Sequence, residues 1–272
     1  MIPNVLTIAG SDSGGGAGIQ ADLKTFSALG AYGCSVITAL TAQNTRAVTA
    51  IHDVPPDFIA AQLDAVFDDI VIHAVKIGML SRPEVIETVA AGLERHHAGP
   101  VVLDPVMVAK SGDRLLQPEA VATLKERLLP MATVITPNLP EAGVLLETAP
   151  PVDEAGMIQT AIALRRLGPR TVLLKGGHLE EPDSIDIFDD GNEPLTLVAP
   201  RIATRNTHGT GCTLSSAIAA LLGRGLPLRE AVREAKAYIT DAIRAADRLQ
   251  VGRGNGPVHH FHALWSKAGI PE

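Results

Sequence analysis

One short segment combines glycines, hydroxyl groups and a thiol directly before a stretch with helical spacing. Residues 206–212 read Asn-Thr-His-Gly-Thr-Gly-Cys, and the apolar pattern of 213–222 predicts a helix after them. Free N–H groups at a helix N-terminus bind anions, and glycines let that backbone approach a phosphate closely. A thiol there is expected to have a lowered pKa, because helix N-termini favour the thiolate. The segment suits phosphate chemistry with Cys212 as a base, or a plain helix cap with a small buried cysteine.

Carboxylates, an amide and a lysine follow three other stretches that read as buried strands. Asp104 ends one of them, and Asn138 and Glu141 form an Asn-x-x-Glu pattern after the next. Mg²⁺ prefers a few such oxygen ligands together with waters and substrate phosphates. Lys175 ends a third stretch, where it suits a phosphate. The alternatives are a helix cap for Asn138 and an ordinary edge lysine for Lys175.

Gln43 closes a β-rich stretch and carries both a donor and an acceptor on one amide. One glutamine amide pairs with a ring nitrogen beside an exocyclic amine, as glutamine does on adenine. Met79 and Val106 follow other predicted strands and could cover the faces of such a ring. A turn without a ligand and plain core positions are the alternatives for these three residues.

A second glycine-rich segment, 10–18, follows the first predicted strand. Its glycine spacing does not match Gly-x-Gly-x-x-Gly, and no Gly-x4-Gly-Lys-Ser/Thr pattern occurs in the chain, so neither a dinucleotide fingerprint nor a P-loop is present. The segment reads as a donor-rich pocket wall. Asp22, one turn into the following helix, could accept hydrogen bonds from a ligand or simply suit the helix dipole.

The elements that position these residues alternate between short apolar runs and longer helical patterns. Such alternation predicts a parallel sheet covered by helices. We expect one α/β domain over residues 1–272, with a central sheet of about eight or more strands. Strands are predicted at 5–9, 33–41, 71–77, 101–103, 132–136, 171–175, 184–188 and 195–198, and helices at 18–29, 57–67, 83–95, 119–129, 154–167, 212–222 and 229–249. Ligands bind beyond the carboxyl ends of strands in such folds, so the polar segments above should meet in one site.

Composition narrows the classes of partner. The formal net charge of −7 argues against nucleic acid, and two cysteines, Cys34 and Cys212, are too few for a disulfide framework. The sequence contains no signal-peptide pattern and no apolar run long enough to span a membrane. We therefore expect a cytoplasmic protein with small-molecule ligands.

Residues 206–212 resemble the anion-hole motif of the ribokinase-like superfamily, in the branch where cysteine replaces the usual aspartate base. From 8–22 to 256–258, the chain resembles the hydroxymethylpyrimidine/phosphomethylpyrimidine kinases of thiamine biosynthesis. The resemblance implies a three-layer α/β/α fold without a large separate lid domain, ATP and Mg²⁺ as cofactors, and a homodimer. It implies phosphorylation of 4-amino-5-hydroxymethyl-2-methylpyrimidine and then of its monophosphate.

The resemblance also implies roles for residues of this chain. The catalytic group is Gly209, Thr210, Gly211 and Cys212. The pyrimidine is expected to contact Gly10, Ala17, Asp22, Gln43, Met79 and Val106. ATP and its phosphates are assigned to Asp104, Lys175, Thr207 and His208, and the metal to Asn138 and Glu141.

Two rival functions remain open on sequence alone. Pyridoxal or pyridoxine kinases share the phosphate machinery, but these relatives carry a second cysteine in segment 108–113, where Ala109 stands here. A non-catalytic pyrimidine-binding regulatory protein should have lost Cys212, Glu141 or the Gly209 and Gly211 pair. All four are present, which disfavours that reading.

Overall fold

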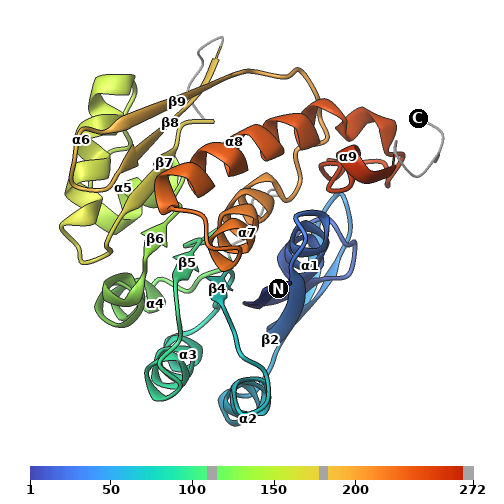
Figure 1. Ribbon diagram of the computed structural model, residues 1–272, viewed down its shortest axis with the longest axis vertical. Helices are drawn as coiled ribbons and strands as arrows, with labels where there is room; N and C mark the ends of the chain where they lie inside the picture. Colours follow the sequence, from blue (N-terminus) through green and yellow to red (C-terminus); the bar gives the residue numbers. More distant parts are fainter. Residues whose placement is uncertain (109–114, 178–182, 266–272) are drawn as a thin grey trace.

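The computed structural model describes residues 1–108, 115–177 and 183–265, whose strands form a single sheet (Figure 1). The strands are β1 (Asn4–Asp12), β2 (Tyr32–Gln43), β3 (Val48–Asp53), β4 (Ala74–Ile77), β5 (Val101–Leu103), β6 (Val134–Ile135), β7 (Val172–Lys175), β8 (Asp183–Asp189) and β9 (Leu195–Pro200). The nine strands lie in the order β3-β2-β1-β4-β5-β6-β7-β8-β9. Pairing is parallel from β2 through β7 and antiparallel for β2 with β3, β7 with β8 and β8 with β9. The predicted mostly parallel sheet of eight or more strands is confirmed.

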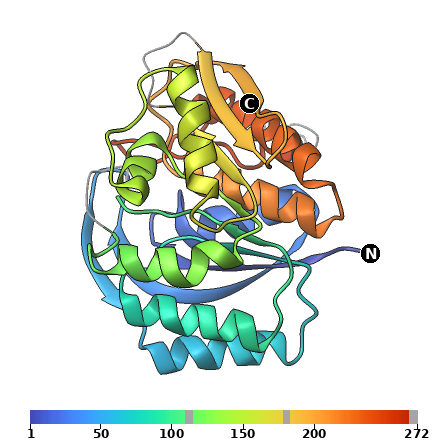
Figure 2. The ribbon, with the colours of Figure 1, turned by 90° about the vertical axis from the view of Figure 1, so that its left-hand side faces the viewer.

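Helices cover both faces of this sheet (Figures 1 and 2). They are α1 (Gly18–Ala28), α2 (Pro56–Phe67), α3 (Pro83–Arg95), α4 (Ala120–Thr123), α5 (Leu139–Leu146), α6 (Glu154–Arg165), α7 (Thr210–Gly223), α8 (Leu228–Arg244) and α9 (His262–Trp265). Helices α2 to α6 bury their apolar sides on one face, and α1, α7 and α8 on the other. This is the expected three-layer α/β/α arrangement. None of the helices in the described ranges is long and apolar enough to cross a membrane.

The two faces follow from the alternation of side chains along each strand. In β1, Leu6 and Ile8 belong to the apolar cluster under α2 to α6, whereas Val5 belongs to the cluster under α1, α7 and α8. In β5, Leu103 and Val102 divide in the same way. Because both faces are covered, these strands carry apolar side chains toward both faces, and a charged side chain within them requires a buried partner or a site.

The strand order places a topological switch between β1 and β4. From β1 the chain adds β2 and β3 on one side, and it then returns to add β4 to β9 on the other. Crevices at such a switch, beyond the carboxyl ends of the strands, are where ligands bind in open α/β sheets. The glycine-rich segment after β1 and the segment after β4 lie at that switch.

Several elements differ from the sequence prediction, among them the short helix α9, which was not predicted. Strand β3 was not predicted, because it is a mostly exposed edge strand without an apolar alternation. Helix α5 was not among the predicted helices, although a helix cap at Asn138 was one of the alternatives; Pro140 lies in its first turn, where proline is well accommodated. The helix predicted over 119–129 is α4 followed by a π-helical turn, Leu124–Leu128, and a 3₁₀ turn, Leu129–Met131.

Candidate active site

A cavity of about 1170 Å³ lies beyond the carboxyl ends of the parallel strands. It is lined by residues that follow β1, β4, β5 and β6, by the end of β7 and by the start of α7. The site residues predicted from the sequence line this cavity, with Asp22 as the exception. The polar segments that follow different strands therefore meet in one place, as predicted.

Gly209 brings the two glycine-rich segments into contact. It precedes α7 with φ of +78°, and a Cβ there would lie 1.8 Å from the carbonyl oxygen of Gly16. Only glycine fits both the conformation and the space. The N–H groups of Gly211 and Cys212 lie in the first helical turn, where they have no acceptor within the helix. This turn therefore offers N–H donors to an anion in the cavity.

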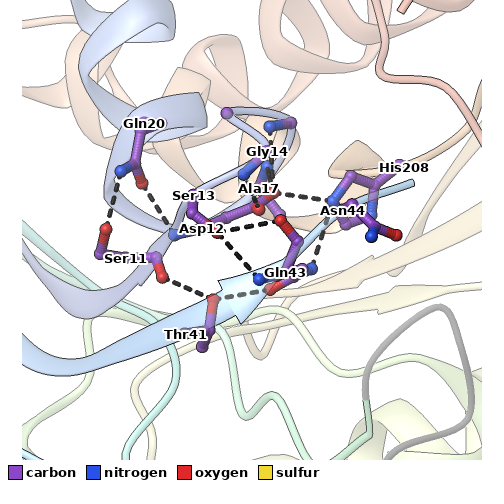
Figure 3. Close-up of polar contacts among 12 residues, drawn as sticks. Ser11, Asp12, Ser13, Gly14, Ala17, Gln20, Thr41, Gln43, Asn44 and His208 are labelled. Carbon is purple, nitrogen blue, oxygen red and sulfur yellow. Dashed lines mark hydrogen bonds and ion pairs between the residues drawn. The ribbon is translucent and has the colours of Figure 1, made fainter. Parts of the chain in front are cut away.

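His208 and Asp12 connect the same two segments through their side chains (Figure 3). His208 Nε2 lies 2.9 Å from Asp12 Oδ2, and the Asp12 carboxyl also accepts hydrogen bonds from the backbone N–H groups of Gly14, Gly16 and Ala17. The contact fixes the wall after β1 to the turn before α7. Thr207 directly precedes His208, and its carbonyl accepts a hydrogen bond from the Thr210 hydroxyl at 2.8 Å.

The thiol of Cys212 does not have the lowered pKa expected from its helix position. Burial raises its pKa to about 11, and the carboxylates of Asp22 and Asp104 also raise it. The Lys76 ammonium and the Gly18 N–H act in the opposite direction, but they do not compensate. The prediction of a lowered pKa was wrong because it considered only the helix N-terminus. With a pKa near 11, the Cys212 thiol is protonated at neutral pH.

Lys175 and Asp104 lie directly beneath the anion-binding turn. Lys175 Nζ is 2.9 Å from Asp104 Oδ1, and Asp104 also accepts a hydrogen bond from the Thr136 hydroxyl at 3.0 Å. A Cβ on Gly211 would lie 3.2 Å from Lys175 Nζ. The lysine charge thus lies next to the free N–H groups of α7, where a phosphate would be held by both.

Asn138 and Glu141 form a capping box at the start of α5. The Asn138 side chain accepts from the Glu141 N–H and the Glu141 carboxylate accepts from the Asn138 N–H, each at 2.8 Å. The cap does not exclude a metal role, because both residues also line the cavity. Burial raises the pKa of Glu141 to about 7; Lys175 opposes the rise and Asp104 adds to it. Within the described ranges no group of three or more His, Cys, Asp or Glu forms a metal site.

Another part of the cavity lining combines an amide with apolar surfaces. Gln43 closes β2, and Met79 packs across Gly10, where a Cβ would lie 3.1 Å from the methionine Cε. Ala17 and Val106 complete this part of the lining. A flat heterocycle would meet the Gln43 amide at its edge and these apolar groups on its faces.

Asp22 does not line the cavity. Its carboxylate is fully buried between α1, β4 and α7, where it pairs with Lys76 Nζ at 2.9 Å. The hydroxyls of Thr7 and Ser216 each donate to it at 2.6 Å. These partners occupy the carboxylate, so the prediction that Asp22 contacts a ligand is not supported by its position.

Lys76 lines the cavity and was missed from the sequence. Its ammonium is fully buried, and burial would lower its pKa, but the charges of Asp22 and Asp104 raise it. A signal was present: within Ala74–Ile77, the lysine occupies a position that alternation assigns to the face under α1 and α7. A charge at a core-facing strand position indicates a buried partner or a site.

Comparison with known proteins agrees with this geometry. A family profile described as phosphomethylpyrimidine kinase matches residues 12–259. A hydroxymethylpyrimidine/phosphomethylpyrimidine kinase of Rhizobium meliloti is 62% identical over 260 residues, covering 96% of this chain and 97% of its own. The enzyme of that name from Escherichia coli is 56% identical over 262 residues, covering 96% of this chain and 98% of its own.

Two solved structures show the same fold. Phosphomethylpyrimidine kinase from Clostridium difficile is 47% identical, with a TM-score of 0.79, and the match covers 89% of this chain and 99% of that one. The ADP complex of Bacillus subtilis pyridoxal kinase is 39% identical, with a TM-score of 0.88 over 96% of this chain and 98% of that one. Ala109, the residue that favours a pyrimidine kinase over a pyridoxal kinase on sequence grounds, lies outside the described residues with the rest of 109–114. The chain belongs to the phosphomethylpyrimidine kinase family.

Proposed function

We propose that this chain transfers the γ-phosphoryl group of ATP to 4-amino-5-hydroxymethyl-2-methylpyrimidine and then to the resulting monophosphate, in thiamine diphosphate biosynthesis. One observation carries the proposal: a single cavity joins the Gln43 amide and its apolar surroundings to the N–H groups of the turn 209–212. A heterocycle paired with the Gln43 amide would have its hydroxymethyl group within reach of the 209–212 turn. The names of the most similar relatives support the same substrate.

In the first transfer the substrate hydroxyl oxygen attacks the γ-phosphorus. The new O–P bond forms, the bond to the bridging oxygen breaks, and its electron pair leaves with ADP. The hydroxyl proton passes to the Cys212 sulfur, which must first be a thiolate. The N–H groups of Gly211 and Cys212, together with Lys175, face the negative charge on the transferred group.

The second transfer makes a smaller demand on the thiol. A phosphate monoester is already ionised near neutrality, since its second pKa is about 6. Its oxygen attacks without losing a proton in the transition state. Cys212 then contributes shape at the reacting centre rather than a base, and the N–H donors and Lys175 carry out the same task as before.

We assign Mg²⁺ to the neighbourhood of Glu141 and Asn138. Their oxygen donors suit this hard cation, and the raised pKa of Glu141 reflects a buried carboxylate near Asp104 that a divalent cation would stabilise in its ionised form. Bound there with ATP, the ion would neutralise charge on the phosphates. Lys175 and the 209–212 turn bind the phosphates from the protein side.

A pyridoxal kinase is the rival supported by a specific observation, the fold match to the Bacillus subtilis enzyme. Identity favours the pyrimidine, at 62% against 39%. Coupled assays of ADP release with hydroxymethylpyrimidine, its monophosphate and pyridoxal separate the two. Turnover of pyridoxal alone would contradict the proposal, and no ATP consumption with any of the three would favour a non-catalytic binding protein.

We further propose that residues 1–272 act as one kinase domain in a cytoplasmic homodimer. The proposal follows the family resemblance and the single sheet. Light scattering on the purified chain should give a mass near twice 28.5 kDa. A monomeric mass at micromolar concentration would contradict the dimer.

A further inference from the structure

Gln43 lies between two side chains that restrict how its amide can be oriented. The amide oxygen faces Thr41 Oγ1 at 3.1 Å, and the amide nitrogen faces His208 Nε2 at 3.5 Å (Figure 3). The two ends of a side-chain amide have nearly the same size. Hydrogen bonding therefore decides which end faces which neighbour.

On the His208 side the neighbour is a donor. His208 Nε2 lies 2.9 Å from Asp12 Oδ2. Burial alone would raise the pKa of Asp12, but the hydrogen bond from His208 and those from the Ala17 and Gly14 N–H groups lower it below its ordinary value. Asp12 is therefore an ionised carboxylate, which only accepts, and Nε2 must carry the proton. An amide NH₂ facing that nitrogen sets two donors against each other.

On the Thr41 side the neighbour is an acceptor. Thr41 has one hydroxyl proton, and its oxygen lies 2.8 Å from the carbonyl oxygen of Ser11. A carbonyl only accepts, so the proton points to Ser11 and a lone pair of the Thr41 oxygen points to Gln43. An amide oxygen facing that lone pair sets two acceptors against each other. Rotating the amide by 180° resolves both conflicts at once.

We propose that Thr41 and His208 hold the Gln43 amide with its nitrogen toward Thr41 and its oxygen toward His208. We also propose that this orientation selects a heterocycle with an amino rather than an oxo group beside its ring nitrogen. The inference rests on the proposed function, in which Gln43 faces the ring. Thr41 and His208 act through Gln43 and are positioning residues for recognition.

The chemistry of the two ring types explains the selection. In the held orientation one N–H and one oxygen lone pair of Gln43 remain for the ligand, in a fixed order. A 4-aminopyrimidine offers an acceptor nitrogen and a donor amine, whereas the 4-oxo lactam offers a donor N–H and an acceptor carbonyl. The ring cannot turn over to compensate, because its hydroxymethyl group must face the 209–212 turn. The 4-oxo compound fits only if the amide rotates back.

The test compares dissociation constants for the 4-amino compound and its 4-oxo analogue by calorimetry. We expect wild type to prefer the amino compound by at least about 100-fold, because a site built for hydrogen bonds rejects a mismatched pattern strongly. Thr41→Val removes the acceptor without changing the shape, and the preference should fall at least about fivefold. Thr41→Ser keeps the hydroxyl and should retain the preference within about twofold. His208→Leu should relax the preference as Thr41→Val does.

The preference ratio separates positioning from a general structural defect. If Thr41→Val weakens both compounds equally, or if it keeps the wild-type ratio in a protein with an unchanged melting temperature, the inference is overturned. The Thr41 pair decides the matter even where His208→Leu fails to fold. If wild type binds neither compound, the proposed function itself fails; if it binds the amino compound but Thr41→Val does not relax the preference, only the inference fails.

Discussion

Burial and the nearby carboxylates raise the pKa of Cys212 despite its position at a helix N-terminus. Phosphorylation of the alcohol should therefore depend on pH. Because the pKa is raised to about 11, the thiolate fraction rises about tenfold for each pH unit through the neutral and mildly alkaline range. For phosphorylation of the alcohol, kcat/KM should therefore increase with pH between 7 and 9. For the monophosphate, kcat/KM should stay nearly constant above its own pKa of about 6. Matched profiles measured on one preparation check this; parallel profiles would contradict it.

Replacement of the thiol should separate the two transfers. Cys212→Ala removes the base, so the rate of alcohol phosphorylation should fall about 100-fold or more, within the usual range for general base catalysis. The rate with the monophosphate should fall less than about tenfold. Single-turnover measurements with each acceptor compare the two directly. Cys34→Ala changes the other cysteine, which is buried outside the cavity lining, and serves as the control. Equal losses with both acceptors would refute the division of labour.

Truncation of Gln43 should affect one ligand only. Gln43→Ala removes the amide proposed to read the ring edge and leaves Lys175 and the 209–212 turn, which also line the cavity, unchanged in sequence. Calorimetry should show pyrimidine affinity reduced about tenfold or more, the equivalent of one or two hydrogen bonds. Affinity for a non-hydrolysable ATP analogue should change less than about twofold. The reverse pattern would assign Gln43 to the nucleotide.

At the scale of elements, the approach of the first glycine segment to the N-terminus of α7 depends on Gly209. Gly209→Ala would place a Cβ 1.8 Å from the Gly16 carbonyl oxygen, so the two segments must separate. A displacement near 1 Å is enough to cost about 100-fold in rate, and we expect kcat to fall by at least that amount. Crystallography of the variant should show the segments displaced.

A second glycine provides the matched control for strain alone. Gly225 has φ of +88° and nothing within 4 Å of an added Cβ. Gly225→Ala should therefore cost about 1 kcal/mol of stability from backbone strain and leave kcat unchanged. A large loss of kcat in Gly225→Ala, or its absence in Gly209→Ala, would contradict the view that close approach is the requirement.

The elements that bear the site were largely predictable, and the misses have physical causes. The turn before α7 was readable because glycines precede a strongly apolar helix, and Asp104 because a carboxylate ends an apolar strand. The sequence did not reveal the raised pKa of Cys212 or the buried position of Asp22. Both depend on Lys76, which β4 brings under α7. Contacts of this kind depend on the order of the strands in the sheet, and a local sequence pattern does not predict that order. Lys76 could have been found by asking why a core-facing position carries a charge.

At the scale of the whole molecule, the buried pair of Asp22 and Lys76 joins α1 to the middle of the sheet, and Ser216 connects the pair to α7. Removing one partner leaves a buried charge without compensation, which costs about 3–5 kcal/mol. Lys76→Met and Asp22→Asn should each lower stability by that amount in urea unfolding. The double variant should be much less unstable than their sum, since neither charge remains.

The exposed pair of Arg95 and Asp64, 2.8 Å apart, is the matched control, and its removal should cost less than about 1 kcal/mol. The double variant also separates stability from chemistry. The Lys76 charge lowers the pKa of the Cys212 thiol and the Asp22 charge raises it, and Lys76 acts more strongly. A folded double variant should therefore retain monophosphate phosphorylation and lose part of the alcohol reaction at neutral pH, and higher pH should recover some of that loss. A loss that higher pH does not recover would mean that the pair supports the fold alone.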